Sequence, residues 1–145
     1  MKFYEQSTSY SCGAACMRMV LEELGIKRSE EALMKIMGSS PKSGTDNNQL
    51  PKLAEHFRLS YVVSRNAKVE DITALQKQGY HIIVGMTDPI DNIGHFTIVK
   101  KVTAKEIEFI DPGHGPSHKL QLSVFKKNWK SMFEPDVGLL IGIRK

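Results

Sequence analysis

Four residues with the side chains needed for thiol catalysis are spread over most of this 145-residue chain. Cys12 is followed by Gly13, Gln6 lies six positions upstream, and His95 and Asp111 lie in the second half. A nucleophilic thiol needs a base that handles its proton, a group that orients the base and a donor for the oxyanion. We therefore predict Cys12 as nucleophile, His95 as base, Asp111 as the orienting carboxylate and Gln6 as the oxyanion donor.

The residues next to Cys12 and His95 fit this chemistry. A free thiol, with a pKa of about 8.5, is mostly protonated at neutral pH, so a catalytic cysteine needs positive charge nearby. An apolar, helix-like segment begins at Cys12, and a helix N-terminus together with an imidazole supplies that charge. Gly13 after Cys12 and Gly94 before His95 leave room for a substrate backbone, and we expect both to contact substrate.

His95 and Asp111 occupy positions that a β-hairpin would bring together. His95 heads one strand-like run and Asp111 ends the next. The start of one antiparallel strand faces the end of its neighbour, so the carboxylate is expected beside the imidazole.

Four motifs resemble those of papain-like cysteine peptidases that process bacteriocins, found at the N-terminus of peptide-exporting ABC transporters. Gln6, Cys12-Gly13, His95-Phe96 and Asp111-Pro112 match in order and context, and the resemblance covers nearly the whole chain. One position departs, because Ser11 stands where that family usually has an acidic residue.

The resemblance implies a cysteine peptidase that cleaves a peptide, such as a double-glycine leader, through a thioester acyl-enzyme. It implies a peptide or protein as substrate, and a transporter or secretion apparatus as a partner if the chain is part of a larger protein.

The order of the expected elements predicts an α+β fold. Helices are expected at residues 12–24, 30–37, 50–57, 69–78 and 123–132. Strands are expected at residues 80–86, 95–102, 106–111, 119–122 and 137–143. We expect one papain-like domain over residues 1–145, with its N-terminal helical half packed on an antiparallel sheet.

Composition and charge argue against several other classes of protein. The net charge of +4 is scattered along the chain, and the basic run at residues 126–130 looks like a solvated helix face rather than a nucleic-acid site. No stretch reads as a signal peptide or membrane segment.

Cys12 and Cys16 are too close for a useful disulfide, which favours a reducing, cytoplasmic location. His114 and His118 flank a Gly-Pro loop, so we expect no metal site and no cofactor.

Two other function classes remain open at this point. A thiol acyltransferase or deamidase of the toxin or effector type could use the same residues, because it differs only in what reaches the acyl-enzyme. A non-catalytic peptide-binding module is the third possibility, and the presence of all four catalytic residue types argues against it.

Overall fold

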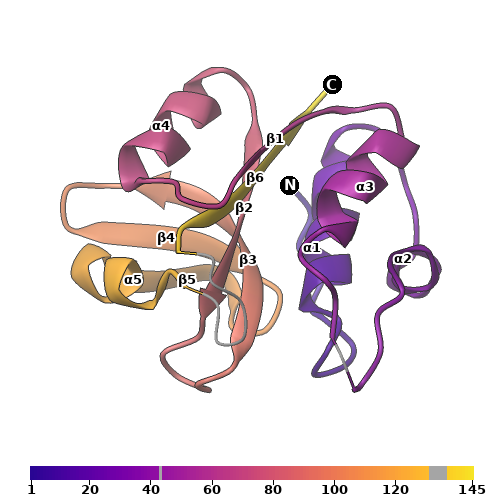
Figure 1. Cartoon of the computed structure of the whole chain (residues 1–145), viewed down its shortest axis with the longest axis horizontal. Coiled ribbons are helices and arrows are strands. Elements are labelled where there is room, and N and C mark those ends of the chain that lie inside the picture. The colour runs from indigo at the N-terminus through magenta and orange to yellow at the C-terminus, as the bar shows by residue number, and fades with distance from the viewer. Residues whose placement is uncertain (43, 131–136) are drawn as a thin grey trace.

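The computed structural model describes residues 1–42, 44–130 and 137–145, which form five helices and six strands (Figure 1). The helices are α1 (Cys12–Glu23), α2 (Glu30–Met37), α3 (Gln49–His56), α4 (Val69–Lys77) and α5 (Leu122–Asn128). The strands are β1 (Ser60–Ser64), β2 (His81–Thr87), β3 (Gly94–Val102), β4 (Glu106–Asp111), β5 (Gly115–Gln121) and β6 (Leu139–Arg144).

All six strands form one antiparallel sheet in the order β1-β6-β2-β3-β4-β5. Strands β2 to β5 follow one another as a meander, whereas β6 inserts between β1 and β2. The last strand of the chain therefore lies inside the sheet rather than at its edge.

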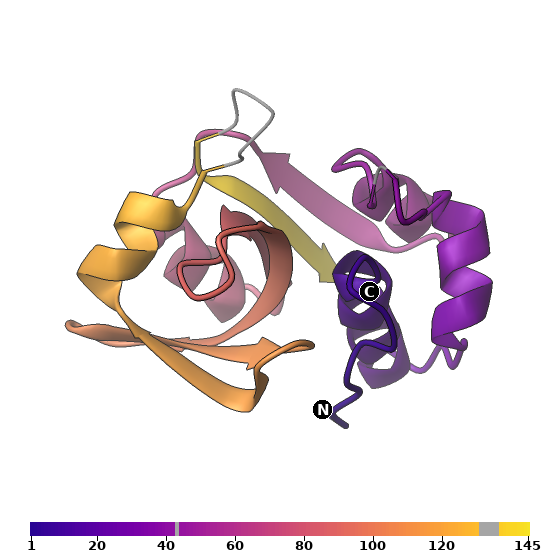
Figure 2. The ribbon, with the colours of Figure 1, turned by 90° about the horizontal axis from the view of Figure 1, so that it is seen from below.

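Helices cover both faces of the sheet, and each face has its own apolar core. Figure 1 shows α1, α2 and α3 on one side and α4 and α5 on the other, and Figure 2 shows the same division from below. Successive side chains of a strand point to opposite faces of the sheet, so neighbouring residues pack into different cores. In β2, for example, Ile83 packs into one core and Ile82 into the other. The expected α+β fold, with the helical half packed on an antiparallel sheet, is confirmed.

The first two helices start and stop where the sequence predicts. Helix α1 is buried on most sides, and the chain leaves it at Gly25 with φ of 89°. Ser29 caps α2 by accepting a 3.1 Å hydrogen bond from the amide of Ala32, and Gly38 ends that helix at φ of 67°.

Three elements differ from the expectation. Strand β1 at Ser60–Ser64 was not expected, and β5 begins at Gly115 instead of residue 119. Helix α5 ends at Asn128, short of the expected 132, and residues 131 and 132 lie outside the described part of the chain. Within the described residues, no helix is long and apolar enough to cross a membrane.

Candidate active site

Cys12 is the first residue of α1, and its side chain is half-buried against β3. The backbone N–H of Phe96 donates to Cys12 Sγ at 3.5 Å. The N-terminal end of the helix dipole and this amide both favour negative charge on the sulfur. No sequence pattern could predict a role for the Phe96 amide, since every residue but proline carries one and only the packing of α1 on β3 directs this one at the sulfur.

His95 lies at the start of β3 and is hydrogen bonded to Asp111 at the end of β4. Its Nε2 is 2.8 Å from Asp111 Oδ1 and 3.0 Å from Oδ2. Ile98 pairs with Ile110, so these two strand ends meet at the same edge, as the hairpin argument expects. Burial of the ring works against its charged form, but hydrogen bonds to Asp111 and Cys12 outweigh that and raise the pKa of His95 to about 10.

The Asp111 carboxylate is held by more than the imidazole. Its Oδ1 also accepts the backbone N–H groups of Gly113 at 2.8 Å and His114 at 2.9 Å. Burial favours the neutral acid, yet the hydrogen bond and charge of His95, with these two amides, lower the pKa of Asp111 to about 2. At neutral pH these pKa values favour an imidazolium against a carboxylate, with the Cys12 sulfur beside them.

Gln6 lies next to the corner that follows Asp111. Its backbone N–H donates to the carbonyl of Pro112 at 2.9 Å, and its Nε2 donates to the carbonyl of Thr8 at 2.7 Å. One N–H of the side-chain amide remains beyond the bond to Thr8. Its Oε1 is buried and has no hydrogen-bond partner among the described residues. The backbone hydrogen bond to Pro112, the residue after Asp111, thus places Gln6 near the His95–Asp111 pair.

Ser11, where the resembling family usually has an acidic residue, is completely buried. Its Oγ accepts the N–H of Thr8 at 3.1 Å and donates to the carbonyl of Thr8 at 3.2 Å. The hydroxyl therefore closes the turn between Gln6 and Cys12, a task that needs a donor and an acceptor on one atom.

The two glycines of the expected substrate-binding set have different surroundings. Gly13 is buried, and a Cβ there would lie 3.3 Å from the Phe96 ring and 3.4 Å from the Thr45 side chain. The glycine thus allows α1 to approach β3. Gly94 is exposed at the start of β3, with open space where a side chain would stand.

Cys16 is fully buried, and its thiol donates to the carbonyl of Phe96 at 3.5 Å. Burial raises the pKa of Cys16 well above that of a free thiol, with nearby Cys12 and Asp111 adding to the shift. The backbone of Phe96 therefore contacts both sulfurs, since its N–H donates to Cys12 and its carbonyl accepts from Cys16.

A set of three potential metal ligands in the described residues is Asp88, Asp91 and His114, whose ligand atoms lie within 4.8 Å of one another. His118 stacks on His114 with ring centroids 4.6 Å apart but does not belong to the set. His114 Nε2 is hydrogen bonded to Asp88 Oδ2 at 2.5 Å. This pairing joins the loop after β2 to the corner after β4, two segments that no local sequence pattern relates.

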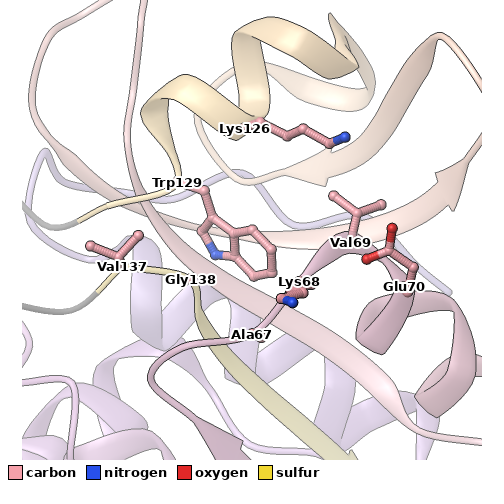
Figure 3. Close-up of a pocket in the computed structure, with 8 residues that line it drawn as sticks. All are labelled: Ala67, Lys68, Val69, Glu70, Lys126, Trp129, Val137 and Gly138. Carbon is pink, nitrogen blue, oxygen red and sulfur yellow. The ribbon is translucent and has the colours of Figure 1, made fainter.

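A separate pocket of about 320 Å³ lies between α4, α5 and the chain before β6 (Figure 3). The indole of Trp129 projects into it, and its lining also includes Lys68, Glu70 and Lys126. None of Gln6, Cys12, His95 or Asp111 lines this pocket, so it is not part of the candidate active site.

Solved structures share this fold over nearly their whole length. The peptidase domain of Streptococcus ComA, a bi-functional ABC transporter involved in quorum sensing, superposes with a TM-score of 0.76 at 17% identity, covering 98% of this chain and 96% of that one. A double glycine motif protease from an AMS/PCAT transporter, solved in complex with the leader peptide, gives 0.72 at 20% identity, covering 98% and 89%. A C39-like peptidase from Bacillus anthracis gives 0.77 at 13% identity, covering 99% and 94%.

A search of curated proteins finds no match to the sequence. The family model of the Peptidase C39 family, in contrast, matches residues 1–133, which is most of the chain. The chain belongs to the Peptidase C39 family and is a cysteine peptidase.

Proposed function

We propose that this enzyme cleaves peptide bonds through a Cys12-His95-Asp111 triad, with Gln6 as an oxyanion donor. The observation that carries the proposal is the His95–Asp111 contact of 2.8 Å beside the half-buried Cys12 thiol at the start of α1. The raised pKa of His95, about 10, supports a charged imidazole that stabilises a Cys12 thiolate.

The reaction divides into two steps. The Cys12 thiolate attacks the carbonyl carbon of the scissile bond, and the carbonyl oxygen becomes an oxyanion that the Gln6 amide and nearby backbone N–H groups stabilise. The His95 imidazolium then gives its proton to the departing amine as the C–N bond breaks, which leaves a thioester on Cys12.

The second step returns the enzyme to its starting state. Neutral His95 takes a proton from water, and the resulting hydroxide attacks the thioester carbonyl. The C–S bond breaks, the peptide acid leaves, and the Cys12 thiolate and the His95 imidazolium are restored. Asp111 keeps its charge throughout, because it orients the ring and stabilises the cation.

The substrate in this proposal is a leader peptide that ends in two glycines. Support comes from the fold shared with the double glycine motif protease that was solved with its leader peptide. The exposed Gly94 beside His95 leaves space for a substrate backbone without side chains. A peptide exporter is the proposed partner, and a reducing compartment such as the cytoplasm is the proposed location, since Cys12 must stay a free thiol.

Mass spectrometry of the reaction products tests the proposal. The protein is incubated with a synthetic double-glycine leader peptide and, separately, with an unrelated peptide library. Cleavage after the two glycines is expected from the wild type and none from Cys12→Ala. A product that carries an added amine, or a glutamine converted to glutamate without cleavage, would instead indicate the acyltransferase or deamidase alternative.

Two further variants test the roles within the triad. His95→Ala should remove nearly all turnover, because it loses the group that moves the proton. Asp111→Asn should retain more turnover, because only orientation and charge stabilisation are lost. If well-folded Asp111→Asn were the less active of the two, the roles would have to be exchanged.

A further inference from the structure

Asp88 organises the loop that leads into His95. It is 3% exposed, its backbone N–H donates to the carbonyl of Ile93 at 2.8 Å, and its carbonyl accepts the N–H of Asn92 at 2.7 Å. Its Oδ1 accepts the N–H of Ile90 at 2.9 Å. One buried residue therefore fixes the path of the chain between β2 and the imidazole, with two bonds from its backbone and one from its carboxylate.

His114 belongs to the corner that follows Asp111. The N–H groups of Gly113 and His114 both donate to Asp111 Oδ1, so the conformation of the corner sets the orientation of that carboxylate. Asp111 approaches the imidazole with both oxygens, at 2.8 Å and 3.0 Å from His95 Nε2. A rotated corner would break this two-oxygen contact.

The side chains of these two organising residues are joined. His114 Nε2 lies 2.5 Å from Asp88 Oδ2, and the His114 ring centroid lies 6.0 Å from that of His95. A second His–Asp pair thus runs beside the first. It ties the loop before the base to the corner after the carboxylate, although the two are not adjacent in sequence.

We propose that His114 and Asp88 are positioning residues that hold the His95 ring and the Asp111 carboxylate in their hydrogen-bonded geometry. The inference rests on the proposed function, because it assigns to this pair the support of the triad. Neither side chain needs to contact the substrate. A displacement of about 1 Å at reacting groups can cost about 100-fold in rate, so a modest shift of either loop would lower kcat.

Three variants test the positioning role. His114→Leu removes the hydrogen bond to Asp88. His114→Gln restores a donor, because its side-chain amide nitrogen can occupy the place of Nε2. Asp91→Asn is the matched control: it neutralises the third member of the potential metal set, whose side chain is 56% exposed and lies 3.6 Å from His114.

Two measurements are made on each variant after circular dichroism has established that it is folded. One is kcat and KM for the double-glycine leader peptide, and the other is the rate of Cys12 alkylation by iodoacetamide at pH 7, which needs no substrate. His114→Leu should lower kcat about 10- to 100-fold with little change in KM, and should slow alkylation. His114→Gln should recover most of both rates, and Asp91→Asn should match the wild type.

Several results would overturn the inference. His114→Leu with wild-type kcat would remove the positioning role, and so would a folded His114→Gln that recovers nothing. Loss of activity in Asp91→Asn, together with loss on treatment with EDTA, would identify the cluster as a metal site instead. Turnover that survives in Cys12→Ala would refute the proposed function itself. An inactive Cys12→Ala beside a fully active His114→Leu would refute only this inference.

Discussion

At the scale of single residues, the two cysteines of α1 lie one turn apart but differ in accessibility. Cys12 is half-buried and Cys16 is fully buried, with its thiol directed at the carbonyl of Phe96. We predict that iodoacetamide near pH 7 labels Cys12 and leaves Cys16 unmodified, because burial favours the unreactive thiol at Cys16. Peptide mapping by mass spectrometry measures the labelling at each site.

The matched controls for this labelling are Cys12→Ala and Cys16→Ala. The first should stay unlabelled until it is denatured, and the second should be labelled as fast as the wild type. Preferential labelling of Cys16 in the folded protein would contradict the assignment of the nucleophile.

A second prediction concerns the amide of Gln6. Loss of one oxyanion donor typically costs about 100- to 1,000-fold in kcat, so Gln6→Ala should fall in that range. Alkylation of Cys12 should be nearly unchanged in the same variant, because alkylation develops no carbonyl oxyanion. Full turnover, or a Cys12 that no longer reacts with iodoacetamide, would give Gln6 a different role.

Residue types and order were enough to predict which side chains the structure brings to one place. Gln6, Cys12, His95 and Asp111 do meet, since each is tied to the same strand ends by a hydrogen bond or by packing. The surrounding contacts were not predictable, because they arise from packing between distant segments. The Phe96 amide on Cys12 and the His114–Asp88 pair are of this kind.

At the scale of elements, α2 supports the loop that carries Gln6. Glu30, in the first turn of α2, is buried, and Ser7 Oγ donates to its Oε1 at 2.5 Å. We predict that Glu30→Ala lowers kcat about 10-fold by loosening this loop, with Cys12 alkylation unaffected. Steady-state kinetics on the leader peptide measures the change.

The neighbouring Glu31 provides the control for this prediction. It shares the first turn of α2, but its side chain is 84% exposed and forms a 3.8 Å ion pair with Lys35. Exposed ion pairs contribute little to stability, so Glu31→Ala should keep wild-type activity. Equal losses in both variants would point to a general effect on the helix instead of the contact with Ser7.

The strand that the sequence did not reveal shows why elements at an edge are hard to predict. Strand β1 is an edge strand whose residues are mostly half-exposed, and it exists because it pairs with β6 from the far end of the chain, as in Tyr61 with Ile143. Such a pairing leaves no local pattern, whereas the buried α1 and β2 carry strong ones. The underestimated length of β5 has the same origin, because its register is set by β4.

At the scale of the whole molecule, the ion pair in the site also contributes to stability. The pKa of Asp111 is lowered from 3.8 to about 2, so its charge stabilises the folded state above about pH 4, and this is lost as the pH falls towards 2. We predict that Asp111→Asn lowers the free energy of unfolding by about 2 kcal/mol at pH 5. The difference from wild type should shrink steadily below pH 4.

Urea unfolding of wild type and Asp111→Asn at several pH values between 2.5 and 6 measures that difference. A difference that stays constant across this range would show that the carboxylate makes no charge-dependent contribution to the fold. In the wild type His95 remains protonated throughout this range, since its pKa lies near 10.

The position of β6 between β1 and β2 sets when the site can be completed during synthesis. The proposed nucleophile at position 12 leaves the ribosome long before the proposed base at 95 and the carboxylate at 111, and the strand that completes the sheet, Leu139–Arg144, follows later still. Until that strand is inserted, β1 and β2 have no common neighbour and α1 has an incomplete surface to dock on. The nascent chain therefore carries Cys12 before the residues proposed to act with it have been made, and peptidase activity is expected only once the sheet is complete.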